Sequence, residues 1–170
     1  PPEPLQMPEG IEADDFEFIE VLNTSANRVS LAGQVVDSGV GFTFREGLKR
    51  FLEPGEAGVL VSHLDSFLER YPDAGGSVLG EYRRQLGNAG DRLVWRDAVG
   101  RVLLSVTFED TWYPRTDGEG YSLTIRSLDA PTASIHTAEA WVPSSVFLGT
   151  PGMVENIDSD NLRLPGDANE

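Results

Sequence analysis

The segment DRLVWRDAVGRVLLSVTF, residues 91–108, joins two apolar runs through a short polar link. Residues 91–96 and 101–108 are rich in Val, Leu, Trp and Phe, which are residue types that strands favour. Asp97 and Gly100 suit the link, because Asp stabilises tight turns and Gly accepts a positive φ. The segment therefore predicts a β-hairpin.

Short apolar runs separated by turn residues continue on both sides of this hairpin. They predict strands at residues 16–22, 29–36, 42–44, 58–62, 78–82, 121–126 and 141–142. The first run is apolar on both alternating faces, which predicts a strand in the interior of a sheet. Gly33, inside the second run, indicates a bulge or a close approach of two backbones.

One helix is expected between these strands. Apolar residues from Leu64 to Tyr71 recur at i, i+3, i+4 and i+7, which places them on one helical face. Ser62 is the expected N-cap and Pro72 the expected end, with a flexible loop over residues 73–77. Many short strands and one helix in a connection predict an all-β, antiparallel sandwich.

The composition suits a single domain. The 170 residues include eight Phe, four Tyr and three Trp, which are enough to fill one core. Residues 1–15 are acidic and Pro-rich and are expected to form a linker. Residues 16–152 are expected to form the sandwich, and residues 153–170 an acidic flexible tail. The chain has no cysteine, which excludes disulfides, thiolate metal sites and cysteine nucleophiles.

The net charge of −15 limits the classes of partner. Nucleic-acid binding depends on cations that displace counterions from phosphates, so no nucleic-acid partner is expected. No apolar run approaches the roughly 18–20 residues needed to cross a bilayer, so direct membrane insertion is not expected either.

A series of short motifs occurs in a fixed order along residues 16–152. They are EFIEVLN (17–23), V-x-L-x-G (29–33), L-x-P-G (52–55), L-x-N-x-G-D-x-L-x-W-x-D-x-x-G (86–100), SVTF (105–108), DG-x-GYSL (117–123) and GTPG (149–152). In this order the motifs resemble the lamin tail domain, and the bacterial branch of that family more than the animal one. No single motif is specific; the joint order carries the resemblance.

The resemblance implies an immunoglobulin-like sandwich that acts as a non-catalytic protein-interaction or scaffolding module. It also implies a place in a larger exported or cell-surface bacterial protein. The family shares no catalytic residues, so none are assigned, and the partner is expected to be a protein or a polysaccharide. The oligomeric state is left open.

The residues themselves suggest one binding site. Trp112 and Tyr113 lie in a predicted loop with the acids Glu109 and Asp117 close by in the sequence. Aromatic rings stack on sugar rings and carboxylates bind hydroxyl groups, so a carbohydrate-binding module is the alternative function. A solvated acidic loop is the simpler interpretation of the same residues.

Calcium is the only cofactor that the sequence suggests, through the acid pairs Asp117 with Glu119 and Asp158 with Asp160. Ca²⁺ prefers several hard oxygen ligands, and a calcium-dependent hydrolase is the second alternative. Neither pair completes a calcium-loop motif, however, so no metal is assigned. The two histidines, His63 and His136, lack the sequence context of a catalytic triad and are expected to be surface residues.

Overall fold

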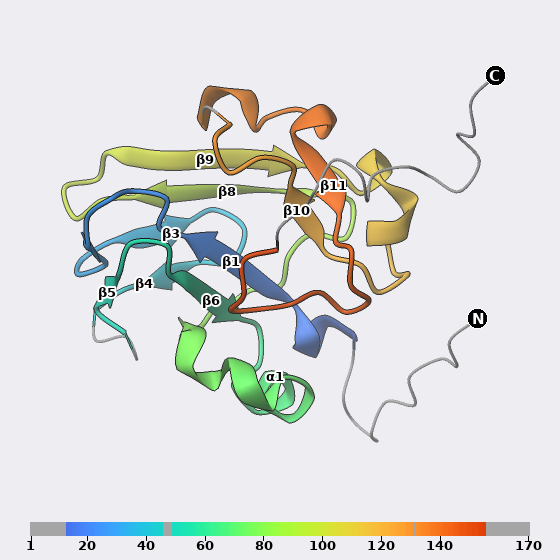
Figure 1. Cartoon of the computed structure of the whole chain (residues 1–170), viewed down its shortest axis with the longest axis horizontal. Helices are drawn as coiled ribbons and strands as arrows, with labels where there is room; N and C mark the ends of the chain where they lie inside the picture. Colours follow the sequence, from blue (N-terminus) through green and yellow to red (C-terminus); the bar gives the residue numbers. More distant parts are fainter. Residues whose placement is uncertain (1–12, 46–48, 131, 156–170) are drawn as a thin grey trace.

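The structure is a computed structural model that describes residues 13–45, 49–130 and 132–155, and it is mostly β (Figure 1). The strands are β1 (Phe18–Leu22), β2 (Val29–Ser30), β3 (Val35–Asp37), β4 (Phe42–Thr43), β5 (Phe51–Leu52), β6 (Ala57–Val61), β7 (Val78–Glu81), β8 (Asp91–Arg96), β9 (Val102–Phe108), β10 (Leu123–Ile125) and β11 (Trp141–Pro143). The described residues form one α-helix, α1 (Leu64–Arg70). Short 3₁₀ turns are η1 (Ala13–Phe16), η2 (Pro72–Ser77), η3 (Asp110–Trp112), η4 (Pro114–Thr116), η5 (Thr132–Ser134) and η6 (Ala138–Ala140). The prediction of an all-β, sandwich-like fold with one short helix is confirmed.

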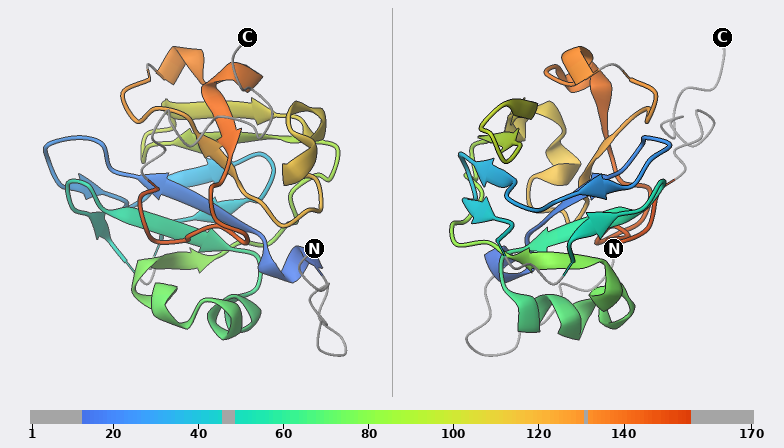
Figure 2. Two further views of the ribbon diagram at one scale, coloured as in Figure 1. Left: turned by 45° about the vertical axis from the view of Figure 1, so that its right-hand side comes forward. Right: turned by 90° about the vertical axis from the view of Figure 1, so that its left-hand side faces the viewer.

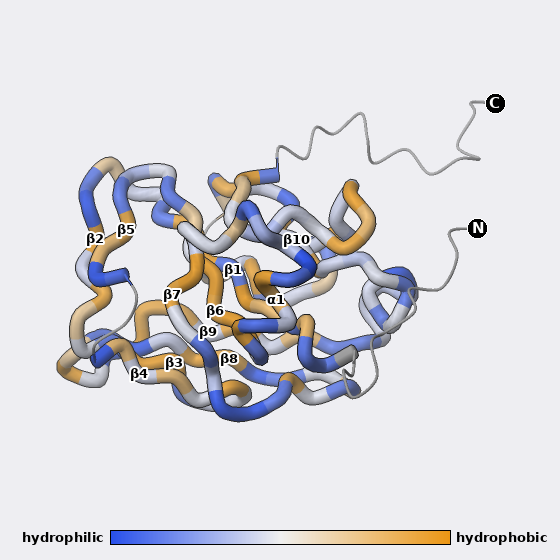
Figure 3. Tube along the Cα trace, turned by 90° about the horizontal axis from the view of Figure 1, so that it is seen from below, coloured by the Kyte–Doolittle hydropathy of each residue, from blue (hydrophilic) through white to orange (hydrophobic). Residues whose placement is uncertain are grey.

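Two sheets face each other across the core (Figure 2). One has the strand order β4-β3-β8-β9 and the other the order β1-β6-β7, while β2–β5 and β10–β11 form separate two-stranded ribbons. Val36 and Trp95 of the first sheet share a buried cluster with Leu60 and Leu79 of the second. Figure 3 shows the resulting apolar concentration along β6, β7 and β3. Burying one such aliphatic side chain contributes about 1.5–3 kcal/mol.

The β8–β9 hairpin forms as predicted. Its strands pair antiparallel from Asp91 with Phe108 to Arg96 with Val102, and Asp97 and Gly100 close the turn between them. Leu104 pairs with Trp95 next to the Arg96–Val102 pair, so Leu103 is an extra residue, a β-bulge. Beyond the bulge, the register alternates core-facing and outward-facing residues in both strands.

β1 lies at the edge of its sheet, so the prediction of an interior strand is wrong. β6 holds the central position, and all five of its residues are buried. β1 is apolar on both sides because both of its faces are covered. Phe18 meets the ring of Phe67 from α1 edge-on at 6.0 Å between centroids, while Ile19 and Val21 pack against the core between the sheets.

β6 and β7 run parallel, whereas the other strand pairs of the described residues are antiparallel. Parallel neighbours need a long crossover connection, and residues 62–77 provide it with α1 inside. α1 covers the outer side of this sheet, where Phe67 shares a buried cluster with Val59, Val61 and Val78. The helix of the sequence prediction therefore connects two adjacent parallel strands.

The N-cap of α1 is His63 rather than Ser62. The Nδ1 atom of His63 accepts a hydrogen bond from the backbone N–H of Ser66 at 3.3 Å, whereas the Ser62 hydroxyl donates to the Asp14 carbonyl at 2.7 Å. Residues 73–77 lie in η2 instead of an open loop. The reason is Pro72, whose ring fixes φ at a helical value at the start of the turn.

The predicted strand at residues 29–36 is two strands in two different sheets. β2 pairs with β5, and β3 pairs with β4 and β8. Gly33 makes the break, because its φ of 73° is accessible to glycine at little cost. A Cβ atom there would lie 2.9 Å from the Cβ of Ala98, which confirms the close approach.

The last described residues close over β1. The N–H of Gly152 donates to the Glu20 carboxylate at 2.6 Å, and the Tyr71 hydroxyl donates to the Leu148 carbonyl at 2.7 Å. At the other end, residues 13–15 of the expected linker lie within η1. The rest of that linker, and nearly all of the expected tail, lie outside the described residues. No helix in the described part of the chain is long and apolar enough to span a membrane.

Candidate functional site

The four residues proposed as a sugar site lie together on the loop that follows β9. Glu109 follows the strand, Trp112 ends η3, Tyr113 lies between η3 and η4, and Asp117 follows η4. Glu109 and Asp117 are exposed, and the two aromatic residues are half-buried. The sequence therefore located the loop, and the role of each side chain depends on its contacts.

Tyr113 is an anchor of this loop. Its hydroxyl lies 3.0 Å from the carbonyl oxygen of Ala138 and 2.9 Å from that of Trp141, within reach of one shared hydrogen bond. This contact ties the loop to η6 and β11, 25 and 28 residues further along the chain. Trp112 is thus the remaining candidate for stacking against a sugar ring.

The acids Asp117 and Glu119 lie in a tight turn, which accounts for their closeness in the sequence without a metal ion. Gly118 and Gly120 have φ values of 76° and 80°, so the DGEG segment changes direction twice with both acids exposed. In the described part of the chain, no three His, Asp or Glu side chains are grouped so that they could hold a metal ion. Asp158 and Asp160 lie outside the described residues, and calcium binding remains a prediction.

His63 and Ser66 lie side by side, as the base and the nucleophile do in some hydrolases. The Ser66 hydroxyl is 2.9 Å from Nδ1 of His63, but Ser66 is only 3% exposed. Helix capping accounts for the contact, since the same Nδ1 atom accepts the Ser66 backbone N–H. His136 is exposed, as expected.

A hollow of about 360 Å³ lies beside His63. It is lined by Asp14, Asp15, Ser62, His63, Tyr82, Arg83, Arg84 and Gln85. Close to it, burial raises the pKa of Glu17, although the N–H of Leu86 donates to this carboxylate at 3.1 Å and opposes the rise. The Tyr82 hydroxyl lies 3.4 Å from the same carboxylate. Glu17 therefore holds the segment after β7 in place.

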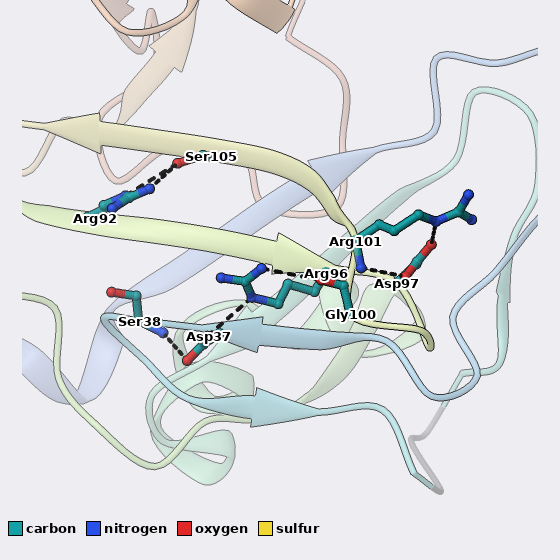
Figure 4. A network of polar contacts seen from close by, with 8 residues as sticks. All are labelled: Asp37, Ser38, Arg92, Arg96, Asp97, Gly100, Arg101 and Ser105. Carbon is teal, nitrogen blue, oxygen red and sulfur yellow. Dashed lines mark hydrogen bonds and ion pairs between the residues drawn. The ribbon is translucent and has the colours of Figure 1, made fainter.

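A second candidate site, not predicted from the sequence, is the outer face of the β8–β9 hairpin (Figure 4). Val94 on this face is only 3% exposed, and its strand neighbours are Asp37 and Ser105. The Arg96 guanidinium meets Asp37 at 3.3 Å, and the Arg92 guanidinium lies 3.4 Å from the Ser105 hydroxyl. Two arginines thus bracket a buried valine in a strongly acidic chain.

The hairpin link carries a third arginine. Arg101 Nε lies 2.7 Å from Oδ2 of Asp97, and the Arg101 backbone N–H donates to Oδ1 at 2.8 Å (Figure 4). Desolvation opposes ionisation of Asp97, but these hydrogen bonds and that from the Val99 N–H outweigh it and lower its pKa. The ionised Asp97 consequently holds both the turn and the arginine.

β9 is an edge strand of the four-stranded sheet. Within the described residues, the backbone of residues 102–107 makes no hydrogen bond beyond its pairing with β8. The strand VLLSVTF contains neither proline nor a charged residue, and of the usual protections of an edge it has the β-bulge at Leu103. Val102 and Leu103 are 52% and 50% exposed, and Val99 in the link is 77% exposed. The edge therefore presents unpaired backbone groups next to apolar side chains.

Comparison with known proteins leaves the family open, since neither the protein-family models nor the curated proteins include a match to this sequence.

Proposed function

We propose that this chain is a non-catalytic protein-interaction or scaffolding module that binds an extended protein segment along the edge of β9. The observation that carries the proposal is the free seven-residue edge with Val102 and Leu103 exposed beside it. An extended segment added to a sheet edge gains affinity from main-chain hydrogen bonds and specificity from alternate side chains. Exposed apolar residues next to such an edge are typical of recognition surfaces.

The proposal extends to the type of fold and its setting. The two facing sheets and the ordered motifs support an immunoglobulin-like sandwich of the lamin-tail type. On that resemblance, the chain belongs to a larger exported or cell-surface bacterial protein and serves it as an accessory module. The carbohydrate alternative now depends on Trp112, because the Tyr113 hydroxyl is engaged by the backbone.

Selection from a random peptide display library tests the edge directly. Peptides selected on the wild-type chain are measured against Leu103→Lys, which places a charge on the edge, and against Leu128→Lys as a matched control. Leu128 is exposed to a similar extent but lies outside the strands. We expect binding to the wild type and to L128K, and at least a tenfold loss with L103K.

Two outcomes contradict the proposal. In one, the selected peptides bind L103K as tightly as the wild type, which would place the recognition surface elsewhere. In the other, repeated selections recover no peptide that binds the wild-type chain. Thermal melts of both lysine variants confirm that the comparison is made between folded proteins.

A further inference from the structure

We propose that β9 takes up an extended protein segment with an acidic side chain opposite Ser105, and that the Arg92 guanidinium binds this carboxylate. This inference rests on the proposed function and names the chemical class of its partner. Residues of an added strand lie opposite those of the edge strand, and opposite residues share a face of the sheet. The side chains on each face of the edge therefore decide which partner fits.

The outer face of this edge carries polar side chains. Arg92 of β8 pairs with Thr107 of β9. Two positions further along, Val94 pairs with Ser105, and alternation keeps all four side chains on one face. The bulge at Leu103 lies outside this stretch and does not disturb the alternation. An added strand would thus meet a guanidinium and two hydroxyl groups on the same side.

The Arg92 guanidinium points from β8 toward β9, at the free edge of the sheet (Figure 4). Its Nε and Nη2 atoms both lie 3.4 Å from the Ser105 hydroxyl oxygen, which is long for a hydrogen bond. Two adjacent N–H groups of a guanidinium can bind both oxygens of a carboxylate. The two donors are therefore directed at the edge and only weakly engaged there.

Arg92 differs from the two other arginines of this hairpin in its charge partner. Arg96 meets Asp37 at 3.3 Å, and Arg101 meets Asp97 at 2.7 Å. Among the residues that the structure describes, Arg92 takes part in no ion pair, and it is exposed. A carboxylate of the partner would thus meet a cation whose charge is not already neutralised.

An added strand brings a carboxylate within reach of these donors. Neighbouring strands lie about 4.8 Å apart, and the Cβ atoms of opposite residues are separated by about 4.5–5.5 Å. The residues on either side of the acidic one lie on the inner face, beside Leu104 and Val106, so apolar side chains suit them. The expected partner therefore has an acidic residue between two apolar residues.

The charge of the whole chain works against such a partner at long range. The net charge of −15 repels an acidic segment, but at physiological ionic strength this repulsion is screened over about 8 Å. A contact between the carboxylate and Arg92 persists under those conditions. Because exposed ion pairs contribute modestly, we expect about a fivefold preference for the acid over its uncharged amide.

The peptides selected on the wild-type chain provide the test. We expect them to carry an acidic residue between two apolar residues. Replacing this acid by its amide, glutamate by glutamine or aspartate by asparagine, should weaken binding to the wild type about fivefold in fluorescence anisotropy. The acid and amide peptides should bind equally to Arg92→Gln. Arg92→Glu should reverse the preference, so that a peptide with lysine at this position binds more tightly than the acidic one.

Arg50→Gln is the matched control for Arg92→Gln. It removes the same charge from an exposed position beside β5, in a ribbon separate from the sheet that contains β9. The preference for the acid should therefore survive in R50Q. A preference that persists in R92Q, or one that is lost equally in R50Q, would show that Arg92 does not bind the acid.

The Leu103→Lys variant separates the two proposals. Selected peptides that lose affinity for L103K but carry no acid between apolar residues would refute the acidic partner and leave the proposed function standing. If no selected peptide binds at the edge of β9, both proposals fail.

Discussion

Replacing Tyr113 by phenylalanine removes one hydroxyl group from the loop after β9. The ring remains, and only the hydrogen bond shared between the carbonyls of Ala138 and Trp141, at 3.0 and 2.9 Å, is lost. A hydrogen bond of this kind contributes about 0.5–1.5 kcal/mol net, so we expect a loss near 1 kcal/mol in the free energy of unfolding. For a domain of this size that corresponds to a fall of about 2–4 °C in Tm.

Urea denaturation followed by tryptophan fluorescence measures this loss. Tyr121→Phe is the matched control, since the structure shows no hydrogen bond from the Tyr121 hydroxyl to any described residue and the chemical change is the same. That ring packs against Phe147 and under Arg115, contacts that phenylalanine retains. If Y113F is as stable as the wild type, or if Y121F loses as much, Tyr113 does not anchor the loop and is free to contact a ligand.

Phe67→Ala should lower the free energy of unfolding by about 3–5 kcal/mol, because the ring is fully buried between α1 and the sheet. Urea denaturation measures this loss, and a loss below about 1 kcal/mol would mean that α1 is not packed there. Burial raises the pKa of Glu17 above 4.5, so its contribution to stability is complete below the unfolded pKa and is lost as pH rises through the folded pKa. Glu17→Gln keeps an acceptor for the Leu86 N–H and should flatten the fall in stability above pH 4.5; an unchanged pH profile would contradict this. For the carbohydrate alternative, a glycan array should show signals that Trp112→Ala abolishes, and an array without wild-type signals would eliminate it.

The sequence predicted well those elements whose pattern is local. The β8–β9 hairpin and α1 were placed within a residue or two, because alternation and helical periodicity are properties of neighbouring residues. The loop with Trp112 was also located, since short strands bound it on both sides.

Long-range relations could not be predicted in the same way. An apolar run on both faces, as in β1, indicates that both faces are covered but not whether a helix or another sheet covers them. The split at Gly33 depends on the approach of Ala98, 65 residues away in the printed sequence. Likewise, the engagement of the Tyr113 hydroxyl depends on carbonyl groups of a distant segment, and the free edge of β9 depends on the order of strands in the sheet.

The closure of residues 148–152 over β1 has a consequence for synthesis on the ribosome. Glu20 and Gly152, which are joined by a hydrogen bond, are 132 residues apart, so the nascent chain exposes that face of β1 until the later segment has been translated. At roughly 5–20 residues per second this delay is about 7–26 s. During that interval α1 is the part of the cover that can already be in place, and a ribosome stalled before Gly152 would hold a chain with Phe18 only partly shielded. Folding intermediates of this kind are the species that chaperones bind.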